Sequence, residues 1–414
     1  MADNVSTIAM MSDAFKNFFL PGLREQMDYG ASAFLAQLER NTENVVGKDI
    51  RITMAYGRTG GIGAINETAS FPTANPRKFK QATWETKDLA AVFQITDKAI
   101  EASKSSVGAF ANMLEKMFQD CETDAKMYIG RSVLGDGTGK LGVIHSAAWG
   151  AGDSSLTLTM TDDFPMVYLS EGMVVDIIDD SATPDALLTG AGTLEVVAVD
   201  DDAKTVKVVG LLADLTDISA TIQADKDYLV AQGSLGRELT GLSAVFNNTA
   251  DIYGLSRTTY PWLKAQLNSS VGEINDMAIQ KLIDNAETRS GSKINFMQCA
   301  LGVGRAYINY KAALRQTVNS LEIKGGYEAM AYVNGGKKIP ITTDKWMPAG
   351  TLDGLDTKDW ALYAMNDWNW RDQGGGVLTK VAGKPAWGAE LIRFCDVGCQ
   401  RVRGQFRASG ITEA

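Results

Sequence analysis

The feature that most constrains the fold is a long amphipathic stretch, "DKAIEASKSSVGAFANMLEKMFQDCETDAKMYIGRSVL", at residues 97–134. Its apolar and small side chains recur at steps of three and four residues, the spacing of one helix face. These positions are Val107, Phe110, Leu114, Met117, Cys121, Ala125, Tyr128 and Ser132, widened by Phe118 and Ile129. Such a long helix must lay its stripe along a sheet or along other helices.

Two β-prone segments precede this helix. In "DIRITMAY", Ile50, Ile52 and Met54 alternate with polar residues, and Tyr56 continues their face. "QATWETKDLAAVFQIT" returns from residue 81 to residue 96, and "GRTGGIGAINETASFPTANPRKF", residues 57–79, lies between the two. The pattern predicts a hairpin with a long end, and loops of this length are commonly functional or disordered.

After the helix, residues 155–236 contain short β signals separated by Asp, Gly and Pro turns, which predict an inserted all-β unit. A capping box at Ser270 and Glu273 then predicts a helix that ends at Gly291. The strand "INFMQCAL" and the helix "GRAYINYKAALRQTV" continue as an α/β alternation, and the tail is β-prone. In that tail, Arg401, Arg403 and Arg407 are expected to lie on one face of a strand. This face is either exposed to solvent or forms salt bridges with another subunit.

Composition limits the class of protein. A length of 414 residues suggests two or three packing units, and 45% hydrophobic with 22% charged residues is typical of a globular chain. The net charge of −10 disfavours wrapping by nucleic acid. The four cysteines form no disulfide pattern, and we find no signal peptide or membrane-spanning run, so we expect a cytosolic protein.

The motifs of enzymes are incomplete. The glycines of 57–63 lack the Gly-Lys-Ser/Thr of a phosphate-binding loop, and Gly137, Gly139 and Gly142 follow a helix where a dinucleotide site needs a strand. The single histidine, His145, excludes paired-histidine metal sites, and Asp200–Asp202 lacks the glycine and glutamate of a calcium loop. We therefore expect no cofactor, no metal and no catalysis, although paired carboxylates stay open.

The order of these elements resembles the major capsid protein of tailed bacteriophages, the Hong Kong-type coat fold shared with herpesvirus shells and encapsulins. The matching segments are "GDGTGKLGVI" at 135–144, "IYGLSRTTYPWL" at 252–263, "NSLEIKGGYEAMAYVNGGKKIPITTDKWMPAGT" at 319–351 and "YAMNDWNW" at 363–370. The likeness covers nearly the whole chain except 155–236. It implies an α+β fold.

The resemblance also implies a division of the chain into parts: an N-terminal arm (1–48), an extended E-loop hairpin (49–95), a peripheral domain with the spine helix (96–154), the inserted β domain (155–236), an axial domain (237–356) and strands that return to the peripheral domain (357–414). In this family the E-loop lies over a neighbouring subunit, and the axial domain meets its copies around fivefold and sixfold axes.

The implied function is a non-enzymatic coat subunit that assembles, as pentamers and hexamers, into an icosahedral shell around double-stranded DNA. We expect a separate scaffolding protein, a portal and in some cases a decoration protein, with assembly in the host cytoplasm and residence in the virion. Subunit contacts are expected at Arg58, Glu67, Phe71, Arg77, Lys78, Lys80, Trp84, Arg401 and Arg403. Alternatives are another ring- or tube-forming phage protein, an encapsulin-like compartment and, with less support, a nucleotide-binding enzyme.

Overall fold

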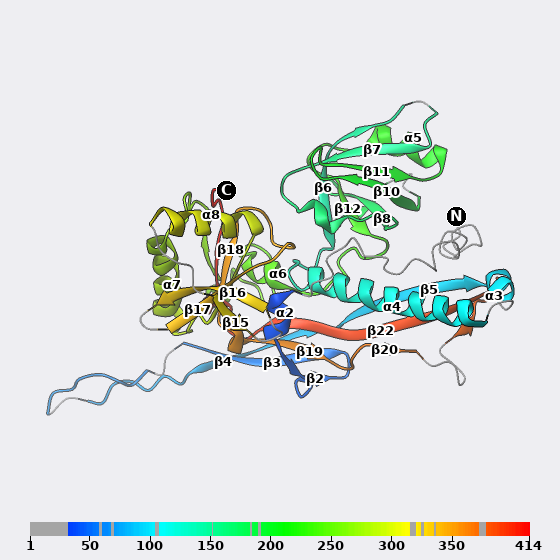
Figure 1. Ribbon diagram of the computed structural model, residues 1–414. Helices are drawn as coiled ribbons and strands as arrows, with labels where there is room; N and C mark the ends of the chain where they lie inside the picture. Colours follow the sequence, from blue (N-terminus) through cyan, green and yellow to red (C-terminus); the bar gives the residue numbers. More distant parts are fainter. Residues whose placement is uncertain are drawn as a thin grey trace.

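The computed structural model describes residues 32–57, 60–67, 70–103, 107–150, 152–182, 184–188, 192–314, 320–323, 327–334, 337–371 and 378–414. Helices and strands are mixed, and they form four parts (Figure 1). We call these parts the long-helix sheet, the hairpin arm, the inserted unit and the α7–α8 unit. No helix in the described ranges is long and apolar enough to cross a membrane.

The long-helix sheet is organised around one strand, β22 (Ala386–Cys399). β22 pairs antiparallel with β5 (Lys87–Thr96) over ten residue pairs. It also pairs antiparallel with β19 (Trp360–Ala364), β20 (Asn369–Trp370) and β21 (Thr379–Lys380). Strand β1 (Glu39–Asn41) pairs with β19 in parallel. Helices α3 (Asp97–Ser103) and α4 (Val107–Ser132) follow β5, and α4 runs beside β5 and β22 (Figure 1). The short helix α2 (Ala33–Gln37) lies near the end of α4, where a Cβ on Gly130 would lie 3.6 Å from the backbone nitrogen of Ser32.

The predicted stripe of α4 is confirmed where side chains are described. Cys121, Ala125, Ile129 and Ser132 are all buried. The stripe positions before residue 116 lie outside the described side chains. Burial of one face along the sheet is what an amphipathic helix of this length requires.

The hairpin arm consists of β3 (Asp49–Tyr56) and β4 (Lys78–Glu85), paired antiparallel from Asp49↔Glu85 to Tyr56↔Lys78, with β2 (Val45–Val46) beside β3. The predicted alternation is confirmed, because Ile50, Ile52 and Met54 are buried and the residues between them are exposed. The predicted second strand is two strands. After Thr86 the chain joins β22 as β5 and no longer pairs with β3.

The inserted unit, residues 140–236, is an antiparallel sheet in the order β10-β11-β7-β6-β12-β8-β9, and an additional β10–β8 pairing closes six of its strands into a barrel. A closed barrel leaves no open edge among those six strands. The strands are β6 (Lys140–Ala148), β7 (Ser155–Met160), β8 (Val174–Asp179), β9 (Ala186–Leu187), β10 (Leu194–Asp200), β11 (Thr205–Val209) and β12 (Tyr228–Ala231).

Two expectations for this unit are wrong. It begins at β6, before residue 155, because β6 pairs with both β7 and β12. It is also not all-β, since α5 (Leu212–Thr221) follows β11. Leu215 and Ile218 lie three residues apart on one face of α5, and both are fully buried. This spacing of apolar residues is that of a helix, although the neighbouring segments have the alternation of strands. The 3₁₀ turn η1 (Met166–Tyr168) completes the unit.

The α7–α8 unit contains the third large sheet, in the order β13-β23-β18-β14-β17-β16-β15. Its strands are β13 (Gln266–Asn268), β14 (Phe296–Cys299), β15 (Ser320–Ile323), β16 (Tyr327–Asn334), β17 (Lys337–Thr343), β18 (Leu352–Leu355) and β23 (Phe406–Ala408). Helices α7 (Asp276–Ser290) and α8 (Leu301–Ala313) belong to it, and α6 (Leu242–Phe246) and η2 (Pro261–Leu263) precede it.

The ends of α7 test the predicted capping signals. Gly291 ends the helix in the left-handed region at φ 72°, as predicted. The N-cap is Asn275, whose side chain accepts the N–H of Ala278, so the predicted box at Ser270 and Glu273 is wrong. Gly272, between those two residues, has φ 70°, which is incompatible with a first helical turn.

Candidate assembly surfaces

The base of the hairpin arm is anchored by aromatic residues of its own chain. Trp84 on β4 packs against Tyr253 and Tyr363, with ring centroids 4.2 and 5.8 Å apart. On β3, Tyr56 stacks on Trp262 at 5.2 Å. These contacts hold the ring of Trp84 against its own chain, where it fixes the direction in which the arm leaves the body. The expected contact of Trp84 with another subunit stays a prediction.

The distal part of the arm extends away from the body (Figure 1). Its two sides stay together beyond β3 and β4, because the N–H of Gly60 donates to the carbonyl oxygen of Asn75 at 2.8 Å. Two large apolar side chains there are almost fully accessible, Ile62 at 88% and Phe71 at 85%. Burying a side chain of this size contributes about 1.5–3 kcal/mol, so the arm carries apolar surface that its own chain leaves uncovered.

Basic and acidic side chains accompany this apolar surface. Glu67, Arg77 and Lys78 are exposed on the distal part. Lys80 is exposed nearer the base, with its Nζ 5.6 Å from the centroid of the Tyr260 ring. Arg58 lies outside the described residues. Contact of these residues with another subunit stays a prediction.

The second surface considered from sequence lies where the chain crosses between the long-helix sheet and the α7–α8 unit. One crossing runs from β18 through η3 (Thr357–Asp359) to β19, and the other runs from β22 through η4 (Val402–Gly404) to β23. The expected strand face with Arg401, Arg403 and Arg407 is wrong, because residues 402–404 form the 3₁₀ turn.

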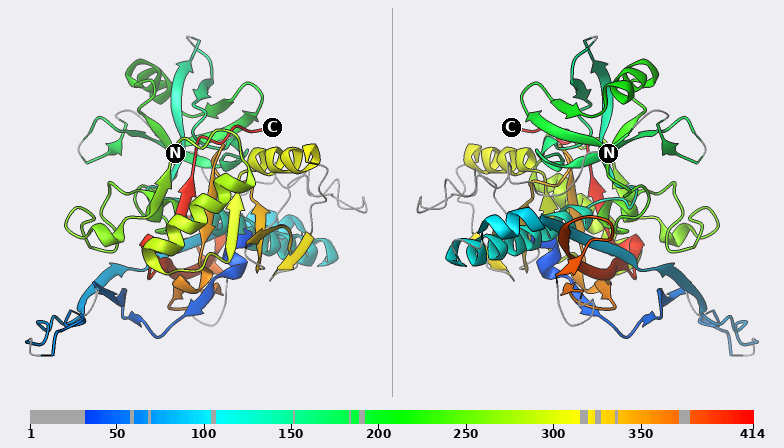
Figure 2. Two further views of the ribbon diagram at one scale, coloured as in Figure 1. Left: turned by 90° about the vertical axis from the view of Figure 1, so that its left-hand side faces the viewer. Right: turned by 90° about the vertical axis from the view of Figure 1, so that its right-hand side faces the viewer.

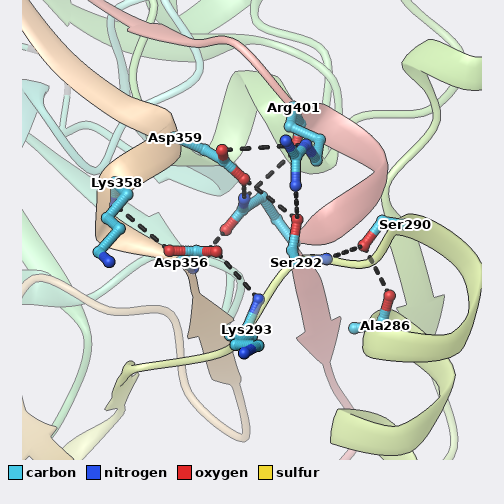
Figure 3. Close-up of polar contacts among 9 residues, drawn as sticks. Ala286, Ser290, Ser292, Lys293, Asp356, Lys358, Asp359 and Arg401 are labelled. Carbon is cyan, nitrogen blue, oxygen red and sulfur yellow. Dashed lines mark hydrogen bonds and ion pairs between the residues drawn. The ribbon is translucent and has the colours of Figure 1, made fainter. Parts of the chain in front are cut away.

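Side chains tie the two crossings together (Figure 3). Asp359 accepts from the hydroxyl of Ser292 at 3.1 Å, and Arg401 lies 4.0 Å from the same carboxylate and 3.4 Å from Ser292 Oγ. Asp356 accepts the N–H of Lys293 at 3.0 Å. Burial raises the pKa of Asp359, and Arg401 opposes that shift.

Gln405 completes this network from inside the protein. Its Oε1 accepts the N–H of Asp356 at 2.9 Å, and its Nε2 donates to Asp359 at 3.3 Å. Sequence reasoning missed Gln405, Asp356, Asp359 and Ser292, because each meets partners that are 46 to 67 residues away. Arg401 is half exposed and already engaged within its chain, and Arg403 is partly buried in η4.

Arg407 has a different environment from the other two arginines. Its Nε and Nη2 donate to the two carboxylate oxygens of Asp353, each at 2.7 Å, and Asp353 is fully buried. Burial raises the pKa of Asp353, while the guanidinium acts in the opposite direction. This pair joins β18 to β23 inside the α7–α8 unit and offers no free charge to a partner.

The glycine motif at 137–142 faces its own chain. A Cβ on Gly137 would lie 3.5 Å from the carbonyl oxygen of Leu239, and a Cβ on Gly139 would lie 3.0 Å from that of Ser234. Carbonyl oxygens repel phosphate, which is bound by N–H groups and cations. The glycines of this loop therefore allow the backbone of residues 234–239 to pack closely against it.

The remaining candidate residues are ordinary structural groups. His145 is exposed and its Nδ1 lies 2.8 Å from Asp225. The four cysteines are free and buried, and burial raises the pKa of each thiol. Across the described ranges, no group of three or more His, Cys, Asp or Glu residues could hold a metal ion.

No protein-family model matches the sequence, and no curated protein matches it. Solved structures do. The Cyanophage A-1(L) capsid aligns over 99% of this chain and 100% of its own, at 11% identity and a TM-score of 0.56. The capsid of Myoviridae phage XM1 aligns over 95% of this chain and 97% of its own, at 7% identity and a TM-score of 0.46. An encapsulin complex of Synechococcus elongatus aligns over 98% of this chain and 96% of its own, at 6% identity and a TM-score of 0.44.

The fold assignment rests on the first of these structures. At that TM-score over both full lengths, the chain has the fold of a phage capsid subunit, and the α+β capsid fold expected from the sequence is confirmed. The residue-level domain boundaries and contacts stay predictions.

Proposed function

We propose that this chain is a major capsid subunit that assembles into a closed icosahedral shell around double-stranded DNA. The observation that carries the proposal is the hairpin arm in the context of a capsid fold: Ile62 and Phe71 stand exposed on an extension that cannot cover them itself. Contiguous exposed apolar surface marks sites of protein interaction. Contacts of one surface with a different surface on the next copy generate rings, and closed rings are what a shell needs.

In this proposal the long-helix sheet is the peripheral domain and the α7–α8 unit is the axial domain that meets its copies around the symmetry axes. The arm lies over a neighbouring subunit, with Ile62 and Phe71 as apolar contacts and Glu67, Arg77 and Lys78 as polar ones. Trp84 instead positions the arm from within its own chain. The shell is assembled in the host cytoplasm with a separate scaffolding protein and a portal, and it performs no catalytic step.

The test shortens the arm without disturbing its base. Replacing residues 57–77 by Asn-Gly leaves a two-residue loop between the terminal pair Tyr56↔Lys78 of β3 and β4, and this dipeptide suits a two-residue hairpin. We expect a folded, soluble subunit with unchanged far-ultraviolet circular dichroism that forms no shells when it is coexpressed with scaffolding protein. Normal-sized particles from this variant, seen by negative-stain electron microscopy, would contradict the proposal.

Point substitutions separate the surface from the length of the arm. Phe71→Ser is expected to reduce the yield of shells and leave the melting temperature of the subunit unchanged. Leu211→Ser is the matched control, because Leu211 is also exposed, at 61%, but lies on the inserted unit. Equal losses from both variants would mean that general solubility governs assembly.

The same preparation distinguishes the alternatives. Open tubes would indicate a tail-type protein, and closed shells that contain protein cargo in place of DNA would indicate a compartment shell. A rise in melting temperature with a nucleotide would support an enzyme, because a ligand stabilises the state that binds it.

A further inference from the structure

Basic side chains are concentrated where the two crossings between the long-helix sheet and the α7–α8 unit meet the end of α7. The segments 288–295, 356–359 and 400–405 together contain five basic and two acidic residues. We call the five basic residues the crossing patch: Arg289, Lys293, Lys358, Arg401 and Arg403. They come from the last turn of α7, the chain before β14, η3 and η4, so no single element of the sequence reveals them as a group.

Hydrogen bonds and close packing bring these segments together (Figure 3). The backbone N–H groups of Lys293 and Lys358 donate to the two carboxylate oxygens of Asp356, at 3.0 and 3.4 Å. A Cβ on Gly404 would lie 3.1 Å from the hydroxyl oxygen of Ser290, so the end of α7 packs against η4. The basic residues of the crossing patch therefore surround one small area of the subunit.

The two carboxylates of this area are largely covered, whereas its cations reach the solvent. Asp356 is buried, and the side chain of Asp359 is 13% exposed. Arg289, Lys293 and Lys358 are exposed, and none of the three forms an ion pair with another residue that the structure describes. The accessible charge of the area is therefore positive.

Exposed apolar surface is missing from the same area. Among the described residues, no exposed large hydrophobic side chain lies in 288–295, 356–359 or 400–405. The neutral side chains beside the cations are polar, such as Asn295 and Thr357, which bond to each other at 2.9 Å. A protein interface has an apolar core inside a polar rim, whereas nucleic-acid phosphates are contacted by Arg, Lys and small polar side chains. The crossing patch has the second composition.

The acidity of the whole chain does not cancel this local charge. Residues 140–236, the inserted unit, contain 16 Asp and Glu and four Lys, whereas all other residues contain 34 acidic and 36 basic ones. The inserted unit and the hairpin arm lie on opposite sides of the molecule, with α7 in the body between them (Figures 1 and 2). Exposed charges more than about 10 Å apart are largely screened at 0.1 M salt. A basic cluster on the body can therefore bind a polyanion although the chain as a whole is acidic.

We infer that the crossing patch contacts the phosphate backbone of the packaged DNA. This inference rests on the proposed function, since it needs a subunit that encloses DNA. The contact is independent of base sequence, because Lys and Arg that bind phosphates do not read the edges of the bases. Release of counterions from the DNA drives it, so each subunit of the shell supplies a weak, salt-dependent attachment for the duplex.

Binding of duplex DNA by the unassembled subunit tests the patch. Fluorescence anisotropy of a labelled duplex, titrated at several NaCl concentrations, gives the affinity and its salt dependence, whose logarithmic slope is about −0.9 for each phosphate neutralised. The double variant Lys293→Gln, Lys358→Gln should bind more weakly at every salt concentration, with a slope shallower by about 2. Asp356 binds the backbone N–H groups of both residues and not their side chains, so the melting temperature should stay unchanged.

The matched control removes two other exposed lysines from the same unit. Lys337 and Lys338 lie on β17, outside the crossing patch. Their replacement by Gln changes the net charge by the same amount and should leave both the affinity and the slope unchanged. Equal losses from the two double variants would overturn the inference, because binding would then follow total charge and not the patch.

Intact shells distinguish DNA from another subunit as the partner. Accessible lysines are acetylated in DNA-filled shells, in DNA-free shells and in the free subunit, and the products are quantified by mass spectrometry. We expect Lys293 and Lys358 to react more slowly in filled shells than in DNA-free shells. Equal rates in both kinds of shell would overturn the inference, and equal rates below that of the free subunit would assign the patch to a contact between subunits. Failure of the chain to form shells would refute the proposed function instead, and the duplex titration would still report whether the patch binds DNA.

Discussion

Asp396 is a buried carboxylate whose ionisation should be measurable in the stability of the unassembled subunit. It lies on β22 and is fully buried. Its Oδ1 accepts the N–H of Thr240 at 2.7 Å and that of Val397 at 2.8 Å, while Oδ2 has no hydrogen-bond partner among the described residues. Burial raises the pKa of Asp396 to about 6, against the effect of those N–H groups, of the Thr240 side chain and of Lys87.

The sign of the effect follows from this shift. Because the pKa is higher in the folded state than in the unfolded chain, the folded state binds the proton more tightly, and stability falls as pH rises from about 4 to about 6. Each pKa unit corresponds to about 1.4 kcal/mol, so a shift of about two units costs the ionised subunit about 3 kcal/mol at pH 7.

Asp396→Asn removes that charge and keeps the accepting oxygen. The new amide N–H groups replace Oδ2 in a place without an acceptor, which costs about 1–2 kcal/mol. We therefore expect a net gain of about 1–2 kcal/mol in the free energy of unfolding at pH 7. At pH 4 the native carboxyl is already protonated, so only the cost of the unpaired amide remains and we expect a loss of about 1–2 kcal/mol.

Urea unfolding of the unassembled subunit at pH 4 to 7.5, followed by tryptophan fluorescence, measures this difference. Other buried carboxylates contribute to both curves, so the quantity of interest is the difference in unfolding free energy between variant and parent, which should change sign between pH 4 and 7. Asp201→Asn, at an exposed turn, is the control and should show no gap. Parallel curves for Asp396→Asn and parent would refute the reasoning.

Three further variants test the packing of the subunit by thermal unfolding. Arg407→Met leaves the carboxylate of Asp353 buried without its partner, so we expect the free energy of unfolding to fall by about 3–5 kcal/mol. A decrease no larger than that caused by a surface substitution would contradict the pairing. Gly404→Ala would place a Cβ 2.0 Å from the hydroxyl oxygen of Ser292, so a loss of about 1–3 kcal/mol is expected, and an unchanged melting temperature would show that the crossing adapts. Trp84→Ala should destabilise the isolated subunit by about 2–4 kcal/mol, whereas a pure assembly contact would lower the yield of shells alone.

Local sequence patterns were sufficient to predict those features in which the buried positions follow the repeat of a single helix or strand. The alternation in β3, the stripe of α4 and the glycine that ends α7 are properties of a few consecutive residues, and all three were predicted. The capsid fold also followed from the order of elements and motifs. In each case the information lies along the chain, at the spacing of a strand, a helix or a turn.

Prediction from sequence failed where contacts between segments that are distant in sequence determine the environment of a side chain. Arg401 and Arg407 look equivalent on a strand, but η4 separates them, and one meets Asp359 at a half-exposed crossing while the other meets a fully buried Asp353. No local pattern reveals Gln405 as the link between two crossings. Helix α5 was missed because its ten residues stand among strand signals of similar length.

The positions of β22 and β23 have a consequence for synthesis of the chain. β22 pairs with four other strands of the long-helix sheet, and β23 joins β13 to β18 in the α7–α8 unit. Both strands lie after residue 385, so neither sheet can be completed until the ribosome has synthesised the segments that precede them and these two strands as well. The inserted unit can close earlier, because all its strands precede residue 232. A chain that terminates before residue 386 thus lacks β22, which organises one sheet, and β23, which joins β13 to the other sheet. Such a chain can still fold its inserted unit but cannot present the two completed sheets to a growing particle.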